Sequence, residues 1–133
     1  GCLESLASGP TIVKMAHEYI MGGKSSKFKE LATSSPISPQ VVAEAAKSGD
    51  EVAKTIFNIT GYWIGIALSN VVNLLNPEII IIGGGVAQAG DLLLDPIRET
   101  VKKRSLKIAA EAVKIVPAEL GESAGVVGAS LLV

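Results

Sequence analysis

Residues 77–91, PEIIIIGGGVAQAGD, place four consecutive isoleucines directly before three consecutive glycines. Four β-branched side chains in a row favour a strand that is buried on both faces, as in a parallel sheet. Glycines at the carboxyl end of such a strand permit left-handed backbone angles and let a flat or anionic group rest on bare peptide. The stretch therefore predicts a strand at about 78–82 and a ligand-binding turn at Gly83, Gly84 and Gly85. A tight strand-to-helix turn without a ligand is the other interpretation.

The glycine run matches neither of the two common phosphate-binding motifs. In the dinucleotide fingerprint G-x-G-x-x-G, read from Gly83, Gln88 stands in the place of the third glycine. The phosphate-loop pattern also fails, because no Gly-Lys-Ser or Gly-Lys-Thr follows this turn. The turn is thus compatible with a nucleotide without being a standard phosphate cradle.

The sequence around this turn alternates between helical and strand patterns. AVKIVPA, residues 112–118, predicts a second short strand at about 113–116, and apolar periodicity predicts helices before, between and after the two strands. This order is typical of a parallel sheet in an α/β domain. Two strands make a poor sheet, and a strand buried on both faces needs neighbours. We therefore expect residues 1–133 to form a single incomplete domain, without an internal boundary, whose other strands lie upstream.

Three helix starts can be read from short polar residues. Ser8 precedes Gly-Pro, Ser38 precedes Pro39, and Asp50 precedes a long apolar-periodic segment. Such side chains accept hydrogen bonds from the first free N–H groups of a helix, and proline suits its first turn. The polar segment 24–36 between the first two helices predicts a surface loop.

The helix that begins after Asp50 is expected to be the longest. Its apolar stripe has 4-3-4-3 spacing and consists of Val52, Ile56, Ile59, Trp63 and Ile66. Beyond Gly61 apolar residues surround the helix, which is typical of a helix packed on most sides. Residues 55–77 carry no charge and are long enough to span a membrane, but their hydroxyls and amides favour a buried helix in a soluble protein.

Charge and cysteine content exclude several classes of function. The net charge is -1, with 12 basic and 13 acidic residues, which gives no electrostatic basis for binding nucleic acid or a membrane surface. Aromatic residues make up 4%, too few for a base-stacking platform. Cys2 is the single cysteine, so an internal disulfide is excluded, and the composition fits a reducing cytoplasm.

Three stretches taken together resemble bacterial glucokinases of the ROK family (repressor, open reading frame, kinase). NPEIIIIGGGVAQAGDLLLDPIRE, residues 76–99, and PAELGESAGVVGASLLV, residues 117–133, resemble the C-terminal part of these enzymes. The opening GCLESLASGP resembles the end of the family's zinc signature, a Cys-x-Cys-Gly-x-x-Gly-Cys-x-Glu run that leads into a helix. The resemblance extends over essentially the whole chain.

The resemblance implies a fold, ligands and site residues. The fold would be the C-terminal portion of the actin/hexokinase-like (ribonuclease H-like) ATPase architecture, with ATP and a hexose, most simply glucose, between two lobes. Gly83, Gly84 and Gly85 would lie against adenosine, and Glu4 would accept hydrogen bonds from sugar hydroxyls. Cys2 would be the last cysteine ligand of a structural Zn²⁺. ATP would act with Mg²⁺, and a homodimer is expected.

The resemblance also implies what this chain does not carry. The family's first phosphate loop, its catalytic aspartate and its Glu-x-Gly-His sugar contacts have no counterpart in these 133 residues. No catalytic residue is therefore assigned here, and the chain alone is expected to be inactive although the full-length protein would phosphorylate the 6-hydroxyl of a hexose. The alternative is a sugar-responsive transcriptional repressor of the same family, with a helix-turn-helix ahead of this region.

Several other residues have plainer interpretations. Asp91 and Asp95 are expected to cap a helix, with a magnesium role as the alternative. His17, the single histidine, is expected to lie on a helix surface. The glycines of the final segment, Gly121, Gly125 and Gly128, predict close helix packing, and a contribution to the nucleotide pocket is the second interpretation.

Overall fold

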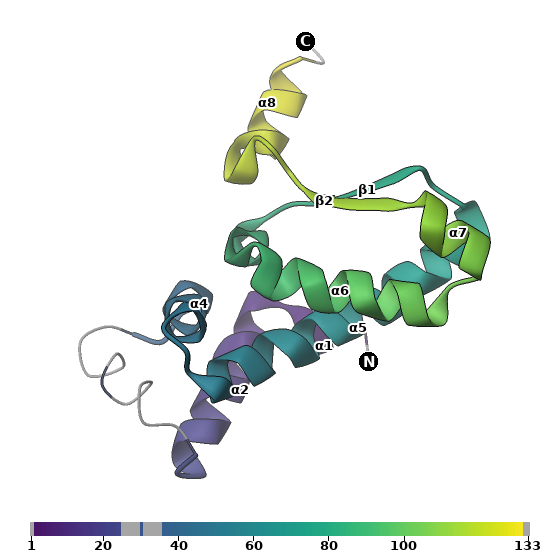
Figure 1. Cartoon of the computed structure of the whole chain (residues 1–133). Helices are drawn as coiled ribbons and strands as arrows, with labels where there is room; N and C mark the ends of the chain where they lie inside the picture. Colours follow the sequence, from purple (N-terminus) through teal and green to yellow (C-terminus); the bar gives the residue numbers. More distant parts are fainter. Residues whose placement is uncertain (1, 25–29, 31–35, 132–133) are drawn as a thin grey trace.

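The structure, a computed structural model, describes residues 2–24, 30 and 36–131. Most of the loop predicted over 24–36 lies outside this part of the chain. The elements follow one another as α1 (Glu4–Ala7), α2 (Gly9–Met21), α4 (Pro39–Lys47), α5 (Glu51–Leu75), β1 (Ile79–Ile82), the 3₁₀ helix η1 (Gly85–Ala89), α6 (Asp91–Arg104), α7 (Lys107–Ala112), β2 (Lys114–Pro117), the 3₁₀ turn η2 (Gly121–Ser123) and α8 (Ala124–Ser130) (Figure 1). The predicted class, mostly helical with two short parallel strands, is confirmed.

The three helix starts predicted from short polar residues are also confirmed. The hydroxyls of Ser8 and Ser38 each accept a hydrogen bond from a backbone N–H in the first turn of α2 and α4. Oδ1 of Asp50 accepts from the N–H groups of Val52 and Ala53, both at 2.9 Å. These caps form locally, so the sequence alone is sufficient to place them.

The fold is organised around the pair of long helices α5 and α6, which run in the same direction and lie against each other through glycine. A Cβ built on Gly61 would lie 2.7 Å from Cβ of Pro96, and one built on Gly65 would lie 2.5 Å from Cβ of Thr100. Real Cβ atoms do not come this close to another carbon, so only glycine allows the two helix backbones to approach to this degree. The small residues of α5 therefore set the separation of the central helix pair.

This approach moves the buried face of α5 away from the predicted stripe. Ile56 is fully buried, but Ile59, Trp63 and Ile66 are only half-buried. The fully buried face contains mainly small and hydroxyl-bearing residues after the first two turns, namely Ala53, Ile56, Phe57, Thr60, Gly61, Gly65, Ser69 and Val72. The predicted stripe was wrong in its second half because large side chains cannot fit where α6 comes closest. The prediction of a helix packed on most sides also fails at its C-terminal end, where Leu74 is 82% exposed.

The buried hydroxyl groups of α5 are satisfied by the helix itself. The buried hydroxyls of Thr60 and Ser69 donate to the carbonyls of Ile56 and Gly65, four residues earlier, at 2.8 and 2.7 Å. Among the described residues α5 is the one helix long and apolar enough to cross a membrane by length and composition. Here it packs against α2, α4 and α6 as the central helix of the fold.

The two strands form a parallel sheet along one side of the α5–α6 pair (Figure 1). Ile79 to Ile82 are in register with Lys114 to Pro117, so both strands lie within one residue of the predicted ranges. Ile80, Ile82 and Ile115 pack on the core, whereas Ile79 and Ile81 are 51% and 61% exposed on the other face. The expectation of a strand buried on both faces is therefore wrong for the residues described, because nothing among them covers the outer face of the sheet.

Arg98 of α6 ties the helix to the sheet. Its Nε donates to the backbone carbonyl of Ile115 at 3.1 Å, and its Nη1 donates to the carboxylates of Asp91 at 3.1 Å and Asp95 at 3.0 Å. One guanidinium thus joins the first turns of α6 to β2. This arrangement fixes the position at which the chain leaves β1 and enters α6.

Candidate functional site: a nucleoside-sized pocket beside the glycine turn

The glycine turn follows β1 directly and is open to solvent. Gly84 has φ of +91°, a left-handed backbone angle that side-chain-bearing residues rarely adopt. A Cβ built on Gly84 meets nothing within 4 Å, and one on Gly83 reaches only Cβ of Ala118 at 3.5 Å, an ordinary contact. Crowding within the described chain therefore does not account for the absence of side chains at Gly83 and Gly84. The backbone of the turn is exposed, and its contact with a ligand stays a prediction.

The short helix η1 follows the glycine turn and packs against α4. The N–H of Ala87 donates to the carbonyl of Gly84 at 3.1 Å, and the N–H of Gly90 donates to Ala87 at 3.0 Å. Ala87 and Ala89 are buried, whereas Gln88 between them is exposed. The small buried residues allow η1 to lie close to α4, and the longer side chains of Val86 and Gln88 line the pocket between the two elements.

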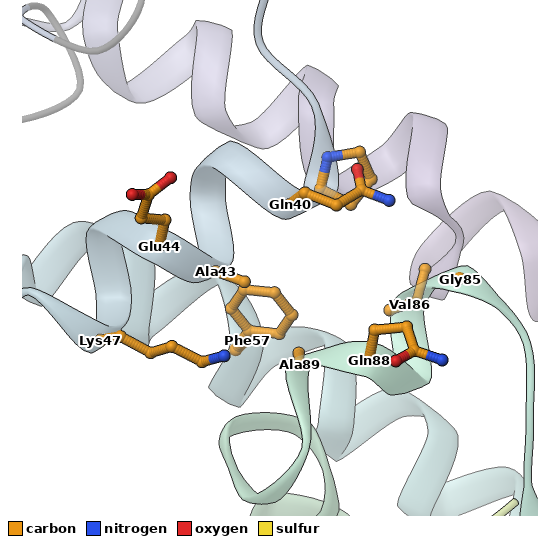
Figure 2. A pocket seen from close by; sticks show the side chains of 10 residues that line it. Gln40, Ala43, Glu44, Lys47, Phe57, Gly85, Val86, Gln88 and Ala89 are labelled. Atoms are coloured by element: carbon orange, nitrogen blue, oxygen red, sulfur yellow. The ribbon is translucent and has the colours of Figure 1, made fainter. Parts of the chain in front are cut away.

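A pocket of about 280 Å³ opens between α4 and η1 (Figure 2). Its base is apolar, since Phe57 of α5 is 1% exposed and Ala43 and Ala89 are also buried. The polar side chains stand around it (Figure 2), and the full set of lining residues is Pro39, Gln40, Ala43, Glu44, Lys47, Phe57, Gly85, Val86, Gln88 and Ala89. An apolar base with a few polar groups at the rim is the usual form of a small-molecule site.

The charges at this pocket indicate which part of a ligand it suits. Its lining includes one ammonium, from Lys47, and one carboxylate, from Glu44. In Figure 2 the Lys47 side chain extends toward Phe57, and the Glu44 carboxylate is directed away from the other labelled side chains. A group with several negative charges needs several cations, a metal ion or converging N–H groups. The lining is therefore better suited to an uncharged group than to one with several negative charges.

The two aspartates after the turn have a different role from the one expected. Gly90, with φ of +63°, is the N-cap residue of α6, and no side chain caps this helix. Asp91 and Asp95 instead pair with Arg98. The capping prediction was wrong because the chain enters α6 through the left-handed glycine rather than through an aspartate. The shared arginine also takes up the carboxylate charge that the alternative magnesium role would need.

The final glycine-rich segment contributes to the same region through one residue. Gly121 has φ of +53°, and a Cβ built there would lie 3.0 Å from Nε2 of Gln88. A Cβ at Gly125 or Gly128 would meet nothing within 4 Å. The prediction of close helix packing is therefore wrong for α8 among the described residues. Gly121 therefore lies close to a residue that lines the pocket, and the alternative interpretation, a contribution to the nucleotide pocket, stays a prediction.

The residues at the start of the chain lie outside this pocket. Cys2 is exposed, and no group of three or more His, Cys, Asp or Glu residues within the described ranges could hold a metal ion. One thiolate does not make the four-ligand site that structural zinc requires, so the described residues do not fit a zinc site by themselves. Glu4 begins α1 and is exposed, and His17 lies on the exposed side of α2 as expected. The roles of Cys2 and Glu4 stay predictions.

Helix α4 supplies one wall of the pocket, and the sequence did not predict this wall. Gln40 and Lys47 line the pocket although they precede the glycine turn by about 40 residues. The contact that joins the two regions includes Gly9, whose built Cβ would lie 3.3 Å from Pro39 and 3.8 Å from Val86. No local sequence pattern marks such a meeting, since it depends on how α2, α4 and η1 pack together.

Comparison with known proteins agrees with this arrangement. The sequence matches the ROK family over residues 1–133. It is 37% identical to a glucokinase of Halalkalibacterium halodurans, over 100% of this chain and 41% of the relative, and 29% identical to a xylose repressor of Caldicellulosiruptor bescii, over 100% of this chain and 33% of the relative. A crystal structure of a ROK family glucokinase from Streptomyces griseus in complex with glucose and AMPPNP superposes with a TM-score of 0.83 and 33% identity, over 99% of this chain and 44% of that one.

These relatives extend well beyond the region compared. The chain spans about two fifths of the length of the glucokinase relative and of the solved glucokinase. The likeness to ROK sugar kinases confirms the expected actin/hexokinase-like fold class. Kinases and repressors are both among the relatives, so family membership is common to both functions. This chain belongs to the ROK family.

Proposed function

We propose that this chain is the nucleotide-binding part of an ATP-dependent sugar kinase of the glucokinase type. The observation that carries the proposal is the open glycine turn, which adjoins an apolar pocket large enough for the base of a nucleotide. The adenine would lie on Phe57 between α4 and η1, and the ribose would pass along Gly84 and Gly85. The likeness to a glucokinase solved with glucose and AMPPNP supports a nucleotide as the ligand.

The rest of the reaction belongs to groups that we do not assign in these residues. The γ-phosphoryl group would pass to the 6-hydroxyl of a hexose, with glucose as the proposed substrate. Such a transfer requires Mg²⁺, a base and donors for the phosphates, and the near-neutral lining of the pocket does not supply them. The contribution of this chain is to bind and orient the nucleoside, and the chain alone is proposed to be inactive.

Further roles follow from the resemblance to the family. We place Glu4 at the sugar hydroxyls, because it is an exposed carboxylate with no hydrogen bond or ion pair to its side chain among the described residues. Cys2 would serve as one ligand of a structural Zn²⁺ completed by other residues of the full-length protein, and its exposure is compatible with that role. Cytoplasmic location and a homodimer complete the proposal.

The binding part of the proposal is tested by closing the pocket. Ala43→Leu would place a larger side chain at its base, and Ala112→Leu makes the same change at an exposed position of α7. Adenosine binding to the chain, followed by NMR chemical shifts, is expected to be lost in Ala43→Leu and kept in Ala112→Leu. Thermal unfolding of both variants separates a blocked pocket from a misfolded protein. Equal binding by the two variants would show that the nucleoside binds elsewhere.

The catalytic part is tested with the full-length protein. ATP-dependent phosphorylation of glucose is expected, measured by coupled detection of ADP. Absence of turnover with glucose, with other hexoses and with N-acetylhexosamines would refute the kinase proposal. Sugar-dependent release from operator DNA without turnover would favour the repressor function, which the similarity to the xylose repressor keeps as the second candidate.

A further inference from the structure

The proposed binding of a nucleotide to the glycine turn does not explain the role of Gln88 in η1. It stands where a dinucleotide fingerprint would have its third glycine, and it lines the pocket from the η1 side. Its side chain makes no hydrogen bond with the described residues. A primary amide has two donor hydrogens and an acceptor oxygen. The hydrogen-bonding capacity of Gln88 is thus available at the edge of a pocket whose base is apolar.

Gly121 determines where the Gln88 amide can lie. The turn at η2 brings Gly121 so close that its built Cβ would be 3.0 Å from Nε2 of Gln88, tighter than ordinary contact. A side chain at position 121 would therefore displace the amide from its place beside the pocket. Glycine is therefore needed at position 121 for two reasons: the left-handed φ of +53°, and the space that the missing side chain leaves for the amide.

We propose that Gln88 reads the 6-position of a purine base in this pocket and that Gly121, by lacking a side chain, leaves the space that the amide occupies there. The inference rests on the proposed nucleotide site. A purine presents N1 next to its exocyclic 6-substituent, so an amide can accept from a 6-amino group and donate to N1. After rotation of the amide by half a turn, the same side chain donates to a 6-oxo group and accepts from N1–H. The site would therefore distinguish purines that carry a 6-substituent from those that do not, and it would bind 6-amino and 6-oxo purines alike.

Other polar groups at the pocket are less suited to this role. Gln40 lies across the pocket from Gln88, in the first turn of α4 (Figure 2), and does not belong to the segment that carries the glycine turn. Lys47 has only donors, so it would favour a 6-oxo purine over a 6-amino purine. Glu44 has only acceptors when ionised, and its carboxylate points away in Figure 2. Gln88 combines both hydrogen-bonding functions with a place in the segment that follows the glycine turn.

The proposal predicts a particular order of nucleoside affinities for the unmodified chain. Adenosine and inosine should bind within about threefold of each other, because the amide serves either substituent. Purine riboside, which lacks the 6-substituent, should bind about 3- to 10-fold more weakly, the usual effect of losing one neutral hydrogen bond. These affinities are measured by titrating the 133-residue chain with each nucleoside and following amide chemical shifts by NMR.

Two substitutions at Gln88 test the reading directly. Gln88→Ala should bind adenosine and purine riboside equally. Purine riboside should bind about 3- to 10-fold more weakly than to the unmodified chain, because its bond at N1 is lost, and adenosine should lose more, because its bond at the 6-amino group is lost as well. Gln88→Glu keeps the acceptors and removes the donors, so adenosine keeps only the bond from its 6-amino group and inosine only the bond from its N1–H. Both should bind about 3- to 10-fold more weakly than to the unmodified chain and still within about threefold of each other. A purely structural role of Gln88 would weaken all three nucleosides alike. Both changes are at an exposed side chain, and circular dichroism confirms that the variants fold.

Substitutions at Gly121 and Gln40 complete the experiment. Gly121→Asn tolerates a left-handed backbone angle but adds a Cβ at the contact, so it should reduce the preference for adenosine over purine riboside as Gln88→Ala does. Gln40→Ala should weaken both nucleosides by the same factor and leave the preference intact. Retention of the preference in Gln88→Ala, or its loss in Gln40→Ala, would overturn the assignment while leaving the nucleotide site standing. If the unmodified chain binds no nucleoside, the site and the role of Gln88 both fail.

Discussion

Replacing Gly65 with alanine tests whether the separation of α5 and α6 depends on the missing side chain. The added Cβ would lie 2.5 Å from Cβ of Thr100, 2.9 Å from its Cγ2 and 3.1 Å from the carbonyl oxygen of Ile97. Carbon atoms in contact normally lie about 3.5–4.0 Å apart, so an overlap of about 1 Å must be relieved. Thr100 cannot easily turn aside, because its hydroxyl donates to the carbonyl of Pro96 at 2.7 Å and β-branched side chains are stiff at χ1. Relief therefore requires the two helices to move apart.

The magnitude follows from two opposing effects. Overpacking a core costs about 1–3 kcal/mol, and the upper part of this range applies because one of the obstructing atoms belongs to the backbone. Alanine in place of glycine inside a helix contributes about 0.8–1 kcal/mol in the other direction. We expect Gly65→Ala to lower the free energy of unfolding by about 1–2 kcal/mol, measured by urea unfolding with far-UV circular dichroism.

The matched control is Gly125→Ala on α8. The same change is made within a helix, but the new Cβ meets nothing within 4 Å. This variant should be as stable as the unmodified chain or more stable by up to about 1 kcal/mol. If Gly65→Ala were also at least as stable as the unmodified chain, the close approach of the two helices could not be what determines their packing.

Three further predictions concern polar groups. Asp50→Ala removes the acceptor of two N–H groups and should lower the free energy of unfolding by about 1–2 kcal/mol in urea melts, whereas equal stability would contradict the capping role. Arg98→Lys loses the planar fork that bonds α6 to the carbonyl of Ile115, so hydrogen exchange should quicken at the start of α6; unchanged exchange would show that the tie is not needed. The hydrogen bond and charge of Lys103 lower the pKa of Glu99, so Lys103→Ala should raise that pKa toward its ordinary value in an NMR titration. Because the folded pKa is lowered, any associated stability is present above the unfolded pKa and declines as pH falls through the folded pKa; an unshifted titration would refute the pairing.

The features that could be predicted from the sequence are those set by local chemistry. Ser8, Ser38 and Asp50 cap helices through N–H groups only two or three residues away, and neighbouring residues determine such contacts. The isoleucine run and its glycines likewise place β1 and the open turn correctly. In each case the physical cause and the effect lie within a few residues of each other.

The features that could not be predicted depend on distant segments. The buried face of α5 is set by the approach of α6, which selects Gly65 over the bulkier Trp63 and Ile66. The pocket needs α4 to meet η1, and these elements are separated by the whole of α5. The pairing of Asp91 with Arg98 could be predicted in part, since residues seven apart lie on one face of a helix. An aspartate just after a glycine turn is equally typical of a helix cap, so the sequence does not decide between the two roles.

The pairing of β1 with β2 has a consequence for how the sheet can grow. The N–H groups of Lys114 and Ala118 point toward β1, so the alternate residues Ile115 and Pro117 present their backbone to the opposite edge. That edge is closed, since the Ile115 carbonyl already accepts from Arg98 and Pro117 has no N–H. On β1 the corresponding groups belong to Ile79 and Ile81, where neither proline nor charge obstructs them. A further strand can therefore join this sheet on one side only, beside the isoleucines that lead into the glycine turn.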